Sequence, residues 1–215
     1  HAINYKPPKI EGRDTTIPSS DEKPNIGLLN KVIKKRQGDL LRLSKINDKL
    51  KNKKSIQIYG GQLGNQLSRV CELIDAGINI PVYKVSIGSF DTHVDQFGRH
   101  RNLLKDLDEG ISGIVAELKQ IGVWDKTLLM TYSEFGRRAK ENGSRGTDHG
   151  MAAPHFLIGG NINGGINGGM PNLDALVNND ILYSLDYRSL YEFVLSNHFN
   201  IEKNPFSKYK SDQII

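Results

Sequence analysis

Three short stretches of this sequence concentrate side chains of the kinds that bind metal ions. Residues 91–93 read Asp-Thr-His, residues 133–137 read Ser-Glu-Phe-Gly-Arg, and residues 146–150 read Gly-Thr-Asp-His-Gly. Each stretch lies next to a segment with the pattern of a β-strand. Open α/β sheets place their metal sites in loops at the carboxyl ends of strands. The sequence therefore predicts a divalent-metal site built from these loops.

Four residues of these stretches are the predicted metal ligands. Asp91 and His93 are two residues apart, so both can reach one ion from the same loop, and this pair of donors suits zinc, manganese or iron. His149 lies in a loop whose glycines allow tight turns, and we expect it to be a ligand. Glu134 directly follows an apolar segment, where a buried carboxylate needs a metal ion, water or a cation as its partner.

Ordinary structural interpretations exist for the same residues. Asp91 could cap the helix that follows while His93 lies on the surface, and the spacing alone does not decide between the two interpretations. Asp148 could cap a turn and leave the histidine beside it without a role. Glu134 could form a structural ion pair with Arg137, three residues along the chain. The guanidinium of Arg137 could equally hold an anionic group of a substrate.

Four segments have the apolar spacing of amphipathic helices. They are residues 26–53, 63–76, 99–121 and 186–198. A glycine interrupts the first segment, which is therefore either one long helix or two shorter ones. Glycines directly follow the second and third segments, as is common at helix ends. Asp186 is the predicted N-cap of the last helix.

Three segments read as strands that would position the motifs. Residues 81–87 alternate between polar and apolar side chains, residues 127–131 form a short apolar run typical of a strand buried on both faces, and residues 155–158 resemble another strand. Alternation of strands and helices favours an α/β fold with a mostly parallel sheet flanked by helices. The glycine-rich residues 159–169 are expected to form a turn-rich connection.

Chain length and composition limit the class of protein. The 215 residues are enough for one α/β domain or for part of a larger one. No apolar run approaches the roughly 20 residues that a membrane span needs, so we expect none. A single cysteine, Cys71, excludes an internal disulfide. Because it falls in a predicted amphipathic helix, we expect its thiol to be buried.

Positive charge is concentrated towards the amino terminus. Residues 1–54 hold 14 Lys and Arg against 6 Asp and Glu, although the net charge of the whole chain is only +5. No aromatic residues interleave with these charges, as a single-strand binder would require. We interpret them as a solvated helix face and do not expect nucleic acid as the main partner. A weaker alternative is that residues 1–54 bind anions or nucleic acid. The chain is thus divided into a basic lead-in with a helical segment, residues 1–54, and an α/β part, residues 55–215. The first 25 residues read as extended and irregular.

Taken in order, the motifs resemble those of a known family. The run Phe90-Asp91-Thr92-His93, the stretch at 133–137 and the run at 141–150 are similar to the bacterial domain-of-unknown-function family number 1501. The resemblance covers about residues 60–200. That family is regarded as sulfatase-like, within the alkaline phosphatase superfamily.

The resemblance implies an alkaline-phosphatase-like fold with a metal centre at the strand ends. It also implies a metal-dependent hydrolase of phosphate or sulfate esters, acting on a small anionic ester that Arg137 would steady. The expected ion is zinc, manganese or calcium, and the expected location is exported or periplasmic. Asp148 would orient His149 from behind. The expected metal ligands are Asp91, His93, Glu134 and His149.

The sequence departs from the superfamily pattern in several places. Phe135 stands where a metal-binding His is usual, Asp91 and His93 are closer together than in the superfamily's Asp-x-x-x-His, and Ser89 replaces a glycine. Residues 1–54 hold nothing like the strand that carries the first metal-binding Asp and the nucleophile, so the nucleophile is not found in this chain. We therefore expect the carboxyl-terminal half of a longer protein, with an incomplete α/β fold that docks with the missing amino-terminal half. The alternative is a non-catalytic or truncated binding module that retains loops like those of a metal site.

Overall fold

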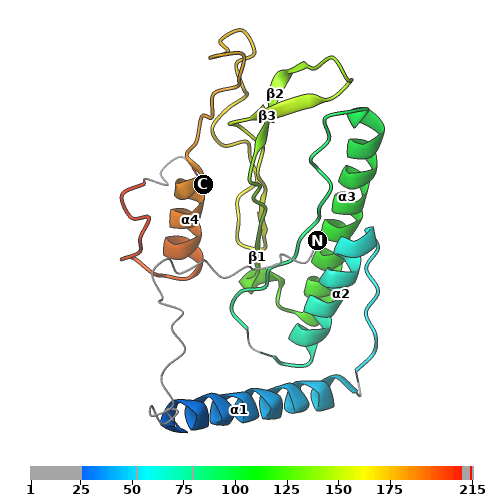
Figure 1. Cartoon of the computed structure of the whole chain (residues 1–215), viewed down its shortest axis with the longest axis vertical. Helices are drawn as coiled ribbons and strands as arrows, with labels where there is room; N and C mark the ends of the chain where they lie inside the picture. The colour runs from blue at the N-terminus through cyan, green and yellow to red at the C-terminus, as the bar shows by residue number, and fades with distance from the viewer. Residues whose placement is uncertain (1–25, 52, 79, 210–213, 215) are drawn as a thin grey trace, which may run out of the picture. The chain divides into compact units, whose positions relative to one another are not determined.

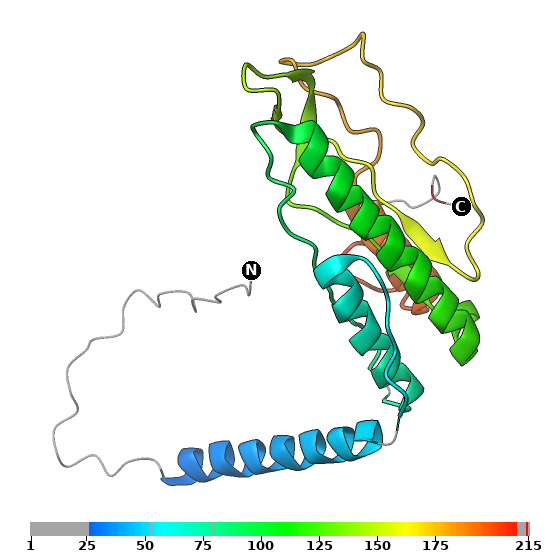
Figure 2. The same ribbon diagram turned by 90° about the vertical axis from the view of Figure 1, so that its right-hand side faces the viewer.

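The structure is a computed structural model that describes residues 26–51, 53–78, 80–209 and 214 (Figures 1 and 2). The described chain divides into two compact units. The first comprises the residues up to 56 together with 72–83, and the second comprises residues 57–71 and 84 onwards. The predicted irregular lead-in at residues 1–25 lies outside the described residues. All three motif stretches belong to the second unit.

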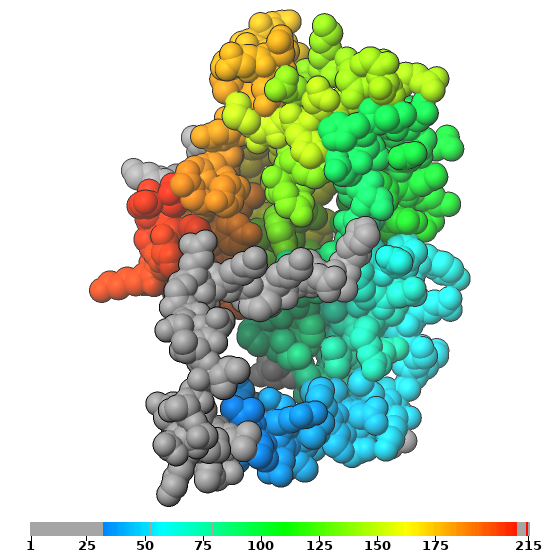
Figure 3. Space-filling view, in the orientation of Figure 1, coloured from blue at the N-terminus to red at the C-terminus, as the bar shows by residue number. Residues whose placement is uncertain are grey.

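A single long helix dominates the first unit. Helix α1 (Ile26–Lys51) is continuous, and Gly38 does not break it, so the segment is one helix and not two. Its described lysine and arginine side chains are exposed, as a solvated helix face requires. Several of its apolar side chains are exposed as well, among them Leu40 and Leu41. Figure 3 draws this helix in blue.

Two packed helices form the core of the second unit. Helices α2 (Gly61–Asp75) and α3 (Gln96–Ile121) lie side by side in both ribbon views. Gly110 makes this close approach feasible, because a Cβ there would lie 3.1–3.2 Å from leucine side chains of α2. The buried apolar residues of the two helices are Leu63, Leu67, Cys71, Ile114 and Leu118. Each of these leucine and isoleucine side chains contributes about 1.5–3 kcal/mol by leaving water. The predicted buried thiol is confirmed, because Cys71 is 0% exposed.

Helix α3 ends where its sequence predicts. Gly122 adopts φ 81° and its amide donates to the carbonyl oxygens of the last turn, a conformation that favours glycine over residues with a side chain. The short 3-10 helix η1 (Trp124–Lys126) then leads the chain towards the strands.

In the part of the chain that the structure describes, four short strands form two separate antiparallel pairs. Strand β1 (Leu128–Met130) pairs with β4 (Leu157–Gly159), and β2 (Gly136–Glu141) pairs with β3 (Thr147–Gly150). Strands are confirmed near residues 127–131 and 155–158. The described residues contain no parallel pair, so the mostly parallel, alkaline-phosphatase-like sheet stays a prediction.

The predicted strand at residues 81–87 is wrong. An alternating pattern becomes a strand only where a neighbouring strand supplies hydrogen bonds, and no described strand pairs with this segment. The side chain of Gln66 takes the place of such a neighbour. Its Oε1 accepts from the Ser86 amide at 3.0 Å, and its Nε2 donates to the Ser86 carbonyl oxygen at 2.8 Å.

The carboxyl-terminal helix begins at the predicted cap. Helix α4 (Tyr187–Phe193) continues into the π-helical turn η2 (Val194–His198). The carboxylate of Asp186 accepts from the backbone amide of Arg188 at 2.9 Å, which confirms the N-cap. The glycine-rich residues 159–169 form an irregular connection after β4, as expected. None of the described helices combines the length and the hydropathy that crossing a membrane requires.

Candidate metal centre

Asp91, His93 and His149 form one group of potential metal ligands. One ligand atom from each residue lies within 4.8 Å of the other two. The Oδ1 atom of Asp91 is 2.9 Å from Nε2 of His93 and 2.8 Å from Nε2 of His149. A single carboxylate oxygen therefore lies between two imidazole nitrogens. The structure brings together three of the four predicted ligands, from two segments that are far apart in the sequence.

The Asp-Thr-His stretch owes its shape to the threonine between the two ligands. Thr92 is only 1% exposed, whereas the side chains of Asp91 and His93 are 60% and 45% exposed. The backbone amide of Thr92 donates to the carbonyl oxygen of Phe90 at 2.9 Å. Because the middle side chain points into the protein, its two neighbours point out together. This explains why a two-residue spacing places both ligands on one ion-sized site.

His149 is held by an aromatic neighbour. It lies in β3, opposite Arg137 of β2, and its ring stacks on Phe135 with centroids 3.8 Å apart and planes inclined by 6°. In the superfamily that the sequence resembles, a metal-binding His is expected at the position of Phe135. In this chain the residue instead lies flat against a ligand ring and fixes its plane.

The structure corrects the predicted partner of Asp148. Its Oδ1 lies 3.6 Å from Nδ1 of His93, whereas the sequence suggested that it would orient His149. Successive side chains of a strand point to opposite faces, so two neighbours in β3 do not readily contact each other. A carboxylate on the far nitrogen of a ligand imidazole fixes the ring orientation and raises its basicity. Asp148 is placed to do this for His93.

Glu134 is not part of the group. It is exposed, and the strand that precedes it, β1, is only half-buried. The prediction that the Glu134 carboxylate is buried was therefore wrong. An exposed carboxylate is hydrated, so Glu134 needs neither a metal ion nor a cation as its partner. The predicted structural ion pair between Glu134 and Arg137 is likewise not formed, because the guanidinium of Arg137 points elsewhere.

Arg137 holds together the segments that carry the ligands. Its terminal nitrogens donate to the carbonyl oxygens of Thr147 and Phe90, and one of them lies 3.5 Å from the hydroxyl of Thr92. The guanidinium also lies over the ring of Phe135, 5.0 Å from its centroid. These contacts give Arg137 a positioning role between β3 and the Asp-Thr-His stretch. Its predicted contact with an anionic substrate stays a prediction.

Asn142 and Gly146 shape the site without having been predicted to do so. The side-chain amide of Asn142 donates to the carbonyl oxygen of His93 at 3.1 Å, and its Oδ1 accepts from the amides of Ser144 and Gly146 at 2.8 and 3.1 Å. A Cβ on Gly146 would lie 2.3 Å from the carbonyl oxygen of His93. The Asn-Gly pair at 142–143 signals a turn, but this contact with residue 93 has no signature in the sequence.

The environment of Asp91 favours its ionised form. The hydrogen bond from His149 lowers the pKa of the Asp91 carboxyl, and the charges of His149, His93 and Arg137 act in the same direction. A metal ligand must be deprotonated to bind. The arrangement thus keeps this carboxyl in the state that a metal ion requires.

The donor set fits a transition-metal ion. Two imidazoles and a carboxylate are the protein ligands of several catalytic zinc sites, which leave a further position open. Each of the three side chains is at least 44% exposed, so a substrate can reach the centre. The two Asp91 spacings of 2.8 and 2.9 Å are hydrogen-bond lengths, slightly shorter than the roughly 3–4 Å between ligands that share an ion.

Comparison with known protein families now adds to the geometry. The family model described as protein of unknown function (DUF1501) matches residues 33–192. The chain belongs to the DUF1501 family. The match includes every residue of the candidate centre, and it confirms the family to which the motifs pointed. No curated protein and no solved structure matches the chain. Since the description of DUF1501 names no activity, the function has to be argued from the site.

Proposed function

We propose that this DUF1501 chain belongs to a metal-dependent hydrolase of phosphate or sulfate esters, of the sulfatase-like kind within the alkaline phosphatase superfamily. The observation that carries the proposal is the convergence of Asp91, His93 and His149, with ligand atoms within 4.8 Å of one another. These residues lie on the surface, where an ester can approach.

Zinc is the ion that the donor set favours within this proposal. Imidazole nitrogen suits zinc well, whereas manganese prefers carboxylates, carbonyls and water. Calcium takes six to eight oxygen ligands, and two of the three donors here are nitrogens. When bound, the ion supplies Lewis-acid polarisation of an ester oxygen and lowers the pKa of a nucleophile beside it.

The residues of the chain have separate parts in this scheme. Asp91, His93 and His149 hold the ion, and Asp148 orients the imidazole of His93 from its other nitrogen. Phe135 keeps the ring of His149 in its plane. The exposed cluster leaves room on its solvent side for the anionic group of the ester.

The proposal extends to the parts of the protein that the superfamily resemblance implies. The nucleophile and the first metal-binding Asp would come from an amino-terminal half, and this chain would form the carboxyl-terminal half of an alkaline-phosphatase-like domain. The resemblance also favours an exported or periplasmic location. A non-catalytic binding module that retains the metal loops is the alternative.

Metal analysis combined with an ester assay tests the proposal. We expect the purified full-length protein to hold zinc and to hydrolyse p-nitrophenyl phosphate or p-nitrophenyl sulfate. Asp91→Ala and His149→Ala should each remove the metal and the activity. His198→Ala is the matched control, because this exposed histidine contacts Phe199 and lies outside the group. Full-length protein that takes up none of zinc, manganese and calcium would refute the metal site. Zinc binding without hydrolysis of either ester would favour the binding module.

A further inference from the structure

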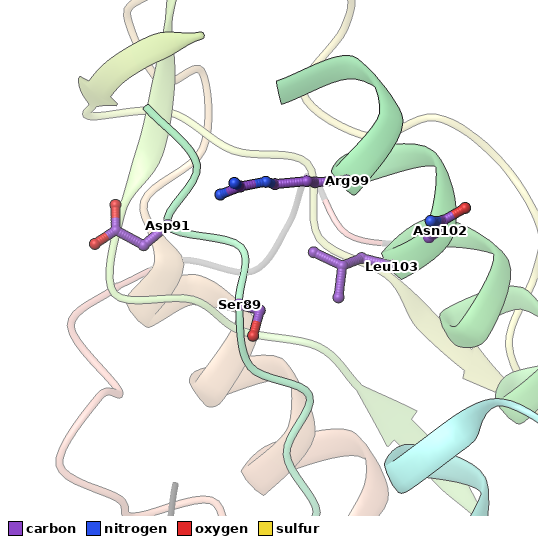
Figure 4. A pocket seen from close by; sticks show the side chains of 5 residues that line it. All are labelled: Ser89, Asp91, Arg99, Asn102 and Leu103. Atoms are coloured by element: carbon purple, nitrogen blue, oxygen red, sulfur yellow. The ribbon is translucent and has the colours of Figure 1, made fainter. Parts of the chain in front are cut away.

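An open pocket lies directly beside the candidate metal centre. It has a volume of about 520 Å³ and is lined by Ser89, Asp91, Arg99, Asn102 and Leu103 (Figure 4). This volume falls within the range of small-molecule sites, which is roughly 300–1,000 Å³. Because Asp91 lines the pocket and also belongs to the ligand group, a molecule in the pocket would touch the metal centre.

One face of α3 forms a wall of this pocket. Arg99 and Leu103 are four residues apart, so they project from the same side of the helix, whereas the side chain of Asn102 points away from the loop in Figure 4. Figure 4 shows the side chain of Arg99 extending from α3 towards the loop that carries Ser89 and Asp91. A side chain on a packed helix is positioned more rigidly than one on a loop. The opposite wall is the loop itself.

Arg99 lines the pocket and forms no ion pair with any residue that the structure describes. Arg145, by contrast, is paired with Asp95, and Arg137 donates to backbone carbonyl oxygens. A guanidinium offers planar, paired donors that match the oxygens of phosphate, sulfate and carboxylate groups. Its availability in a pocket suggests a ligand with such oxygens.

The loop opposite Arg99 is built in an unfavourable backbone conformation. Ser89 has φ 69°, in the left-handed region that costs residues with a side chain about 1–2 kcal/mol. Strain of this kind clusters at ligand-binding sites, where the rest of the protein maintains it. Here it accompanies a hydroxyl that lines the same pocket.

We propose that Arg99 binds the anionic oxygens of the ester substrate. This inference rests on the proposed function and assigns the recognition of the anion to Arg99 in place of Arg137. The carboxylate of Asp91 shares the pocket and repels an anion when no cation neutralises it. The substrate is therefore an ester whose anion is held jointly by Arg99 and by a cation on Asp91, His93 and His149.

Calorimetric titration with inorganic phosphate and with sulfate tests this assignment on the zinc-loaded full-length protein. We expect Arg99→Gln to weaken phosphate or sulfate binding by about tenfold or more, because charge-assisted hydrogen bonds are about twice as strong as neutral ones. Arg101→Gln is the matched control. Arg101 is exposed on the same helix but does not line the pocket, so its loss should leave binding within about twofold.

Zinc content, measured on the same samples, separates this inference from the proposed function. Arg99→Gln should retain the zinc of the wild type. Wild-type binding of either anion by the Arg99→Gln protein would overturn the assignment of Arg99 and leave the metal site standing. Failure of zinc-loaded wild type to bind phosphate or sulfate would overturn it as well. Binding that depends on Arg99 in a protein that takes up none of zinc, manganese and calcium would support the anion subsite and refute the metal-dependent hydrolase.

Discussion

A single oxygen of Asp91 connects the two histidines of the candidate centre, at 2.9 and 2.8 Å. The side chains around it have been fixed before any ion arrives, by the buried Thr92 on one side and the stacked Phe135 on the other. A site whose ligands are already oriented loses less conformational freedom on binding. The side chains of the centre are therefore preorganised for metal binding. The contribution of each supporting residue to the metal affinity can be tested by substitution.

Asp148→Asn should weaken zinc binding about 10–100-fold, which is the usual effect of removing a carboxylate behind a ligand histidine. The substitution preserves the shape of the side chain and removes the charge beside Nδ1 of His93. Competition with a chromogenic chelator measures the affinity. Asp108→Asn, on the exposed side of α3, should have no effect. An unchanged affinity in Asp148→Asn would show that His93 needs no carboxylate behind it.

At the scale of elements, the β2–β3 hairpin is what delivers His149 and Asp148 to the Asp-Thr-His stretch. Its turn is closed by Asn142, whose side chain reaches the carbonyl oxygen of His93, and Arg137 fastens its strands to Phe90. These contacts join the hairpin to the Asp-Thr-His stretch, although Arg137 and Phe90 are more than 40 residues apart in the sequence. A substitution in the turn should consequently shift the positions of the metal ligands.

Gly146→Ala tests this coupling. The new Cβ would lie 2.3 Å from the carbonyl oxygen of His93, and relieving such a clash typically costs about 1–3 kcal/mol. We expect a lower melting temperature and weaker zinc binding. Gly143→Ala, in the same turn, is the matched control, because no atom lies within 4 Å of its Cβ. Equal behaviour of the two variants would argue against tight packing of the turn on His93.

At the scale of the whole molecule, the sequence predicted what depends on near neighbours in the chain. The hydrogen bonds of a helix are local, and so α1, α2 and α3, the Asp186 cap and the stop at Gly122 could be predicted. A strand depends on a partner that is distant in sequence, which is why residues 81–87 were predicted wrongly. Whether a mostly parallel sheet exists stays a prediction for the same reason.

For the candidate site too, the sequence predicted the features that depend on residue type and local sequence, and it did not predict those that depend on tertiary contacts. Asp91, His93 and His149 could be predicted, because metal chemistry restricts the residue types and the loops are marked by glycine. Glu134 was placed by an assumed burial that β1 does not provide. Arg99 was not predicted at all. Only the tertiary structure places that face of α3 against the loop of Asp91.

The stability of the whole chain should respond to acid through Asp186. Its hydrogen bond from Arg188 lowers the pKa of the Asp186 carboxyl to about 2, below the ordinary value of about 3.9. The folded state thus favours the carboxylate, so the stabilisation is complete above about pH 4 and is lost as the pH falls towards 2. Asp186→Ala, which removes the N-cap, should cost about 1 kcal/mol at neutral pH.

Urea unfolding of wild type and Asp186→Ala at several pH values measures this effect. The difference in the free energy of unfolding should be constant from pH 7 to about 5 and should shrink below pH 4. Ser189→Ala, three residues along, is not a suitable control because Ser189 is buried. Glu202→Gln changes an exposed carboxyl beyond the helix and should leave the difference near zero throughout. A difference that persists unchanged at pH 2 would contradict the assigned role of the carboxylate.

The stacking of Phe135 on His149 should produce a ring-current shift in the proton NMR signals of His149. The circulating electrons of a benzene ring shield nuclei above its face, and the imidazole lies 3.8 Å away and nearly parallel. The carbon-bound protons of His149 should resonate upfield of those of His198, whose ring meets Phe199 at 85°. One line in the proton spectrum would then report on this imidazole through every titration, with no label added to the protein.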